Sequence, residues 1–141
     1  MQLTTLFFLL PIVTSLNIQF LGQRQKGKPE PPVECIEGET FIKERLMDLT
    51  FKISPQAFFQ INTETAEKLY QEVSNVASLD QNTVLFDVCC GTGTIGLCLC
   101  SKVKEVHGID IVEEAIKDAN ANAKANDITN AEFHAGNDIL L

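Results

Sequence analysis

The sequence predicts an α/β fold in which helices alternate with the strands of a parallel sheet. Three observations predict it: short apolar runs that suit buried strands, amphipathic helical segments between them, and a glycine-rich turn that joins one run to a helix. Tight alternation of helices and strands is typical of parallel sheets with right-handed crossovers. We therefore expect the order helix, strand, helix, strand, helix, strand along the second part of the chain.

Periodicity and turn chemistry place the elements of this second part. A helix should begin at Asn62 or Thr63, either of which can cap it, and run to about Ala77, since apolar residues recur every three or four positions. A strand over 83–88 is apolar almost throughout, as expected of a strand covered on both faces. A glycine turn, a helix over 94–102, a strand over 105–109, an Ala-rich helix from 111 or 112 to 125 and a strand over 131–135 should follow.

The first part of the chain, residues 1–50, is predicted to be a strand-rich lead-in, and we place the α/β part at residues 51–141. Strands are expected over 13–20, 34–42 and 49–53, with a Pro- and Gly-rich loop over 22–32. The apolar run at 6–10 has no basic segment before it and is followed by Pro11. We interpret it as buried strand rather than as a signal peptide or a membrane span, and we expect no membrane association.

Composition limits the class of protein. The chain has 141 residues, 45% of them hydrophobic, which suits one globular domain that needs no metal or disulfide for stability. Its formal net charge of -8 argues against a free-standing nucleic-acid binder, so any basic surface for RNA must be local or lie elsewhere. The five cysteines are odd in number and include no C-x-x-C pair, which predicts reduced thiols, no metal site and an intracellular protein of the cytoplasm, nucleus or mitochondrion.

The turn after the strand over 83–88 carries the most specific motif. Gly91, Gly93 and Gly96 have the spacing G-x-G-x-x-G between a strand and a helix, which predicts a Rossmann-like nucleotide site. The first glycine permits the tight turn, the second lets the backbone approach a ligand, and the third lets helix and strand pack closely. Asp110 ends the next strand 19 positions after Gly91, where a carboxylate can accept hydrogen bonds from a ribose diol.

The identity of the nucleoside cofactor depends on Asp87, which lies just before this turn. The glycines alone fit NAD, FAD or S-adenosyl-L-methionine, and a Rossmann oxidoreductase is one alternative. A carboxylate near the start of the helix suits a cationic ligand better than a pyrophosphate, which favours S-adenosylmethionine. Asp87 could instead simply stabilise the N-terminus of the helix.

Two segments in order resemble the RNA uracil-C5 methyltransferases, which are class I enzymes dependent on S-adenosylmethionine. They are Phe51-x-Ile53-Ser54-Pro55-x-Ala57-Phe58-Phe59-Gln60-x-Asn62 and Asp87-Val88-Cys89-Cys90-Gly91-Thr92-Gly93-Thr94-Ile95-Gly96-Leu97. The chain looks closest to the eukaryotic tRNA enzymes that make 5-methyluridine in the T loop. The resemblance covers residues 38–141 and implies a Rossmann-like class I methyltransferase sheet, S-adenosylmethionine as cofactor and tRNA as partner.

The resemblance also implies roles for single residues. Gln60 matches a glutamine that contacts S-adenosylmethionine, Asp110 matches the ribose acid, and Asn137 matches a polar residue after the third strand. Cys89 and Thr94 match turn positions near the cofactor but differ from the bacterial pattern, so we expect backbone rather than side-chain contributions from them. Independently of the resemblance, the apolar side chains of Phe58 and Phe59 are expected in the core.

The reaction of the family needs a cysteine thiolate that attacks C6 of uracil and a base that later removes the C5 proton. The resemblance places both beyond Leu141, so no catalytic residue is assigned within this chain, and Cys90 is interpreted as part of the turn. The predicted sheet stops after three strands, which suggests truncation at the C-terminus. The alternative function is a catalytically inactive fragment that only binds the cofactor or a partner.

Overall fold

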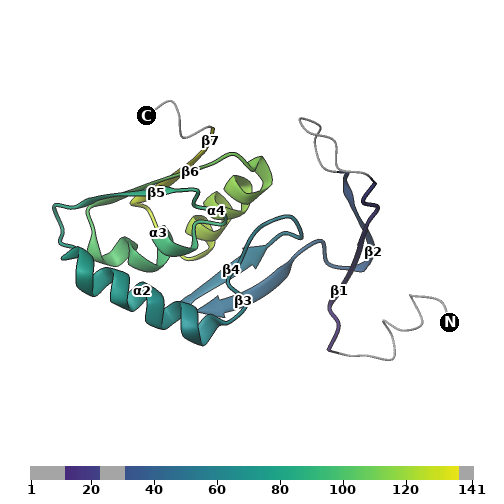
Figure 1. Ribbon diagram of the computed structural model, residues 1–141, viewed down its shortest axis with the longest axis horizontal. Helices are drawn as coiled ribbons and strands as arrows, with labels where there is room; N and C mark the ends of the chain where they lie inside the picture. The colour runs from purple at the N-terminus through teal and green to yellow at the C-terminus, as the bar shows by residue number, and fades with distance from the viewer. Residues whose placement is uncertain (1–11, 23–30, 137–141) are drawn as a thin grey trace. The chain divides into compact units, whose positions relative to one another are not determined.

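The computed structural model describes residues 12–22 and 31–136, and the chain divides into two compact units, residues 1–42 and 43–141 (Figure 1). Asn137, the apolar run at 6–10 and most of the expected loop over 22–32 lie outside the described residues. No helix within the described parts is long and apolar enough to cross a membrane.

The first unit contains an antiparallel pair of strands, β1 (Ser15–Gln19) and β2 (Val33–Gly38), whose register shifts between Leu16 and Asn17. The strand expected over 13–20 is confirmed. The single strand expected over 34–42 is wrong, because β2 ends at Gly38 and a new strand begins at Ile42. Gly38 adopts a φ of 79°, which only glycine accepts readily, and this conformation ends the extended run.

The second unit opens with a hairpin. Strand β3 (Ile42–Leu46) pairs with β4 (Leu49–Ile53) through a two-residue turn in which Met47 has a φ of 55°. Leu46 and Phe51 are fully buried, so the hairpin contributes two of the largest side chains of the core.

Helix α2 (Thr63–Ala77) follows and confirms the expected bounds. Asn62 caps it, because the Oδ1 atom of Asn62 accepts a hydrogen bond from Thr65 N at 3.0 Å. The buried face is narrower than the apolar periodicity suggested: Ala66 and Tyr70 are buried, whereas Leu69 is 53% exposed.

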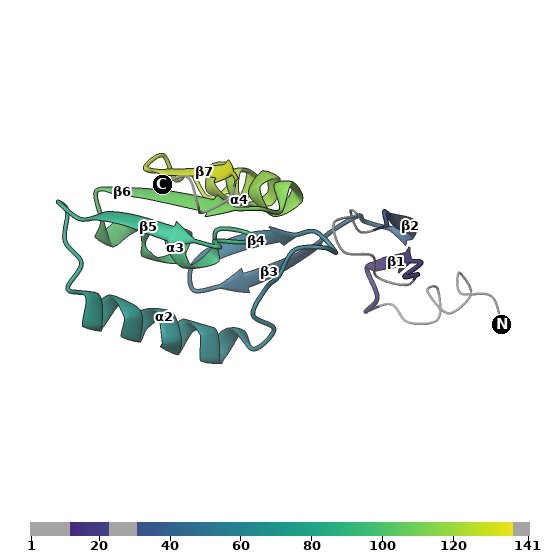
Figure 2. The ribbon, with the colours of Figure 1, turned by 45° about the horizontal axis from the view of Figure 1, so that its top comes forward.

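Three parallel strands form the central sheet in the order β5 (Val84–Val88), β6 (Glu105–Asp110) and β7 (Ala131–Ala135). Helix α3 (Thr94–Leu99) and helix α4 (Glu113–Ala125) connect them, so the expected alternation is confirmed (Figure 2). The helix expected over 94–102 is shorter than predicted, since it tightens into the 3₁₀ turn η1 (Cys100–Lys102).

Both connecting helices pack on one face of the sheet. Phe133 of β7 lies close to Gly93 at the start of α3 and to Ala119 of α4, and Val106 of β6 packs against Gly96. On the opposite face Val84, Phe86 and Val88 are exposed, and no described helix covers them. The expectation that β5 is covered on both faces is therefore wrong for the part of the chain that the structure describes.

Candidate functional site

The glycine turn between β5 and α3 forms the centre of the candidate site. Cys89, Gly91 and Gly93 have φ values of 61°, 56° and 75°, so the backbone turns through left-handed conformations three times in five residues. A Cβ atom on Gly91 would meet only the Phe58 carbonyl oxygen, at 3.7 Å. Glycine is therefore needed at position 91 for its conformation and not for lack of space.

Gly93 and Gly96 are needed for packing. A Cβ atom on Gly93 would lie 2.8 Å from Phe133 Cζ, and one on Gly96 would lie 2.7 Å from Val106 Cγ1. The predicted role of Gly96 in close helix–strand packing is confirmed by this contact. The motif predicts that the second glycine lets the backbone approach a ligand. In the structure the atoms closest to Gly93 belong to core side chains instead.

Asp110 holds the turn in place. Its Oδ2 atom accepts a hydrogen bond from Gly91 N at 2.9 Å, and its Oδ1 atom accepts one from Val112 N at 2.9 Å. The backbone carbonyl of Asp110 accepts a third from Gly136 N, also at 2.9 Å. One residue thus joins the segments that follow β5, β6 and β7, at the carboxyl edge where α/β sheets bind ligands.

The Asp110 carboxylate keeps capacity for a ligand. A carboxylate has about four lone-pair sites, and the two backbone donors use two of them. Asp110 is only half-buried, so the remaining sites are accessible. Its assignment to a ribose diol stays a prediction.

The segment that contains Gln60 runs beside the glycine turn. The Phe58 carbonyl oxygen is the atom nearest to the Cβ position of Gly91, and the exposed Gln60 follows two residues later. Phe59 packs against Phe51 with ring centroids 5.9 Å apart and is half-buried, whereas Phe58 is 72% exposed. The expectation that Phe58 is a core residue is wrong, because its backbone rather than its ring meets the turn.

Comparisons with known proteins agree with this geometry. The family model described as "Methyltransferase domain" matches residues 79–140. The chain is 50% identical over 125 residues to tRNA (uracil-5-)-methyltransferase homolog A of Mus musculus, a match that covers 88% of this chain and 20% of the mouse protein. It is 44% identical over 124 residues to homolog B of Pongo abelii, covering 88% of this chain and 26% of that protein. Over 88% of its length the chain is therefore similar to tRNA (uracil-5-)-methyltransferases.

Solved structures give the same result for the fold. The tRNA (uracil-54, C5)-methyltransferase of Pyrococcus abyssi in complex with S-adenosyl-L-homocysteine has a TM-score of 0.65 and 34% identity, covering 82% of this chain and 29% of that one. Trm5b of Pyrococcus abyssi has a TM-score of 0.67 at 23% identity, covering 94% of this chain and 39% of that one, and supports the fold alone. The chain spans about a fifth to a quarter of the length of the curated relatives named above.

Asp87 is buried at the base of the site. Its Oδ2 atom accepts a hydrogen bond from Gly96 N at 3.0 Å, in the first turn of α3. Burial raises the pKa of the Asp87 carboxyl, the hydrogen bond from Gly96 opposes this, and the Asp110 carboxylate adds to the rise. The hydrogen bond to Gly96 N shows that Asp87 stabilises the N-terminus of α3. Its contact with a cationic ligand remains a prediction.

Thr94 and Cys89 lie at the two ends of the turn. The Thr94 side chain is buried and hydrogen-bonded to the Tyr70 hydroxyl of α2, so it faces the core. Cys89 is exposed and adopts a left-handed φ, which is strained for a side chain other than Gly, Asn or Asp. The expectation that these residues contribute to the site through their backbones stays a prediction.

Two buried thiols, Cys90 of the turn and Cys98 of α3, are not suited to nucleophilic attack. Burial, together with the nearby Asp87 and Asp110 carboxylates, raises the pKa of Cys90 to about 12. Burial also raises the pKa of Cys98 to about 12. A thiol must lose its proton to act as a nucleophile, so neither can do so at neutral pH.

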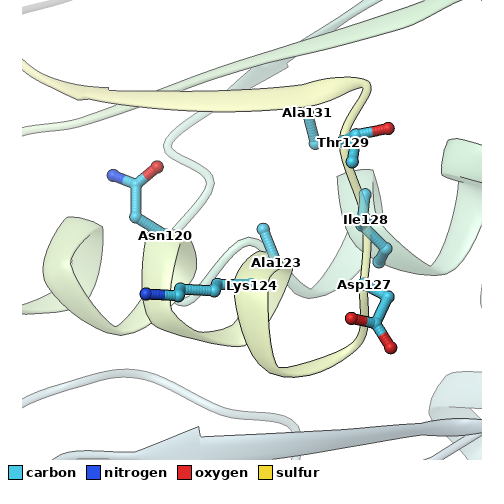
Figure 3. Close-up of a pocket in the computed structure, with 7 residues that line it drawn as sticks. All are labelled: Asn120, Ala123, Lys124, Asp127, Ile128, Thr129 and Ala131. Atoms are coloured by element: carbon cyan, nitrogen blue, oxygen red, sulfur yellow. The ribbon is translucent and has the colours of Figure 1, made fainter.

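A hollow lies at the opposite, amino edge of the sheet (Figure 3). It is lined by residues from the C-terminal half of α4 and the loop that enters β7: Asn120, Ala123, Lys124, Asp127, Ile128, Thr129 and Ala131. None of the residues predicted for cofactor binding lines it, and ligands of open α/β sheets bind at the other edge.

Sequence reasoning missed two polar residues beside the turn. Thr92 is fully buried, and its hydroxyl is the only buried side-chain polar atom without a hydrogen-bond partner among the described residues. Asn122 is 1% exposed and contacts the turn from α4. The sequence does contain a signal for Asn122. Polar residues recur every four positions on a face of α4 that is otherwise apolar.

Proposed function

We propose that this chain binds S-adenosylmethionine at the carboxyl edge of its sheet, as the cofactor-binding part of an enzyme that methylates C5 of a uracil in tRNA. The observation that carries the proposal is the glycine turn fastened to Asp110, with the Gln60 segment beside it. The similarity to tRNA uracil-C5 methyltransferases over 88% of the chain supports the choice of cofactor and substrate.

The residues at this edge fit the proposed cofactor. Gly91 brings bare backbone to the edge of the sheet, and the Asp110 carboxylate has unused acceptor sites nearby. The unpartnered hydroxyl of Thr92 lies in the same turn.

Each residue then has a defined task. We assign to Asp110 the acceptance of hydrogen bonds from ribose hydroxyls, and to the Gln60 amide the amino-acid end of the cofactor, because an amide both donates and accepts. The Asp87 carboxylate supplies negative charge behind the turn. When bound, the cofactor provides an electrophilic methyl group. The nucleophilic cysteine and the base of the reaction are assigned to no residue of this chain.

The proposal extends to the partner and the compartment. The net charge of -8 does not favour tRNA binding by this chain's surface as a whole, so contact with tRNA is assigned to the complete enzyme. The odd number of cysteines and their spacing support a reducing, intracellular compartment.

Isothermal titration of the chain with S-adenosylhomocysteine and, separately, with NAD tests the cofactor. We expect binding of the former and none of the latter. Binding of NAD alone, or of neither ligand by a chain that circular dichroism shows to be folded, would contradict the proposal. Methyl transfer is tested with the complete enzyme, labelled S-adenosylmethionine and unmodified tRNA. Label should appear in 5-methyluridine, and a tRNA whose T-loop uridines are replaced by cytidine is the control.

A further inference from the structure

Helix α4 presents a row of polar side chains to the free edge of strand β4. On its other edge β4 pairs with β3, and on this side backbone N–H groups of Thr50, Lys52 and Ser54 face the helix. Side chains of α4 satisfy them. The three bonded pairs are Asn126 with Thr50, Asn122 with Lys52, and Asp118 with Ser54.

The spacing of the two elements explains this match. Residues four apart in a helix are separated by about 6 Å along its axis, and residues two apart in a strand by about 6.5 Å. Polar residues at positions 118, 122 and 126 therefore reach backbone groups at 54, 52 and 50 in turn. In each asparagine Oδ1 accepts a hydrogen bond from the strand N–H and Nδ2 donates to the carbonyl of the same strand residue.

Asn122 and Asn126 differ in their further acceptor: Asn126 donates from Nδ2 to the Asn122 carbonyl at 2.8 Å, whereas Asn122 reaches the glycine turn. Both asparagines bond β4 at distances between 2.7 and 3.0 Å. Asn122 also donates from Nδ2 to the Thr92 carbonyl, at 3.4 Å, in the middle of the glycine turn. Its amide thus touches β4 on one side and the candidate cofactor turn on the other, and it is almost fully buried between them.

The strand that Asn122 holds leads directly to the Gln60 segment. After Ser54 the chain makes a turn in which Ala57 N donates to Ser54 O at 3.0 Å. The Phe58 carbonyl then lies beside Gly91, and Gln60 follows. The position of Gln60 relative to the glycine turn therefore depends on where β4 is held. Asn122 is the side chain that bonds both β4 and the glycine turn.

We propose that Asn122 is a positioning residue for the cofactor site, whose amide fixes strand β4 and the Gln60 segment against the glycine turn. This inference rests on the proposed function for its effect on the cofactor. Its structural half, the coupling of β4 to the turn, is independent of any ligand. Nothing in the glycine motif requires an asparagine at this position of α4.

The test compares Asn122→Ala with Asn126→Ala, which loses the corresponding pair of bonds to β4 and a bond to the Asn122 carbonyl, but no bond to the turn. S-adenosylhomocysteine binding is measured by calorimetry at a temperature where both variants are folded. Losing the bond that orients the turn should weaken binding of Asn122→Ala about 5- to 10-fold, the scale of one hydrogen bond, whereas Asn126→Ala should stay within about twofold of the unaltered chain.

Hydrogen exchange without ligand is the second measurement. In Asn122→Ala the amides of residues 90–93 should exchange faster relative to those of β7, while Asn126→Ala should leave that ratio unchanged. If Asn122→Ala does not fold, Asn122→Leu replaces it, because that change keeps the volume of the side chain and removes both the acceptor and the donors. Unchanged exchange and affinity in a folded Asn122 variant would overturn the proposal, as would equal losses in the Asn126 control.

The two measurements separate this inference from the proposed function. If the unaltered chain fails to bind S-adenosylhomocysteine, the proposed function fails, and the exchange ratio alone decides whether Asn122 couples β4 to the turn. If the unaltered chain binds and the Asn122 variant binds equally well, the positioning role fails while the proposed function stands.

Discussion

Two polar side chains fasten the loops at opposite edges of the parallel sheet, and they do so with opposite chemistry. At the carboxyl edge the Asp110 carboxylate accepts hydrogen bonds from the N–H groups of Gly91 and Val112. At the amino edge the Asn130 amide donates to three carbonyl oxygens at 2.9–3.3 Å. These carbonyls belong to the segment between α3 and β6: Cys100, Val103 and Lys104.

Under the proposed function, the difference concerns the hydrogen-bonding capacity that each side chain keeps for a ligand. The two N–H bonds of the Asn130 amide are shared among three acceptors, so they have no further capacity. The Asp110 carboxylate has lone pairs to spare and is only half-buried. Under the proposed function, loop closure and ligand recognition coincide at the carboxyl edge, whereas Asn130 at the amino edge is assigned to loop closure alone.

Replacing Gly91 should have the largest effect. The Gly91→Val variant should lose cofactor binding by at least about 100-fold, because a β-branched residue at a φ of 56° costs about 1–3 kcal/mol and distorts the backbone that faces the ligand. Calorimetry with S-adenosylhomocysteine measures the loss, and circular dichroism checks folding. Gly22→Val is the matched control, since no atom lies within 4 Å of a Cβ there. Normal binding by a folded Gly91→Val protein would show that the site is misplaced.

Removing the Asp110 carboxylate should come next. Asp110→Ala should weaken cofactor binding by about 1.5–3 kcal/mol, the range for lost hydrogen bonds to a charged group, and should lower stability because two backbone donors lose their acceptor. Asp110→Asn keeps one acceptor atom and should lie between the unaltered chain and Asp110→Ala. A folded Asp110→Ala protein with unchanged affinity would remove this residue from the site.

The amino edge should respond differently. Asn130→Ala should lower the free energy of unfolding by about 1–3 kcal/mol, because carbonyl groups near η1 lose their donor. Cofactor affinity, measured on the folded protein, should not change. Urea denaturation and calorimetry on the same preparation give both values. A loss of affinity as large as that of Asp110→Ala would mean that the two edges are not functionally distinct.

The features that sequence predicted correctly are those set by local chemistry. Asn62 caps α2 because its side chain reaches an N–H three residues away, and the glycine turn follows from the spacing of Gly91, Gly93 and Gly96. The parallel order of β5, β6 and β7 follows from the alternation of strands with helices. Each of these needs only the residues of one segment and its immediate neighbours.

The features that sequence did not predict depend on contacts between distant segments. Phe58 is as apolar as Phe59, yet only the second finds Phe51 to pack against. The Thr94 hydroxyl turns to the core because Tyr70 of another helix is there to bond it. The Asn122 amide bonds a strand 70 residues earlier in the chain, a distance at which spacing within α4 gives no information about the partner.

The smallest effect is expected at Asp87, which belongs to the carboxyl edge by position but is bonded as a structural group. Its folded-state pKa is raised by burial, so the folded chain binds this proton more tightly than the unfolded chain does. The contribution of Asp87 to stability is therefore complete below its unfolded pKa and is lost as the pH rises through the folded value. The free energy of unfolding of the unaltered chain should fall relative to that of Asp87→Asn as the pH increases across this interval. Urea denaturation at several pH values measures the difference, and a difference that grows in the opposite direction would show that the carboxylate is stabilised by its bond to Gly96 more than it is penalised by burial.

The Asp87→Asn variant should also bind S-adenosylhomocysteine about two- to fivefold more weakly, within about 1 kcal/mol, if Asp87 acts on the cofactor only through its charge.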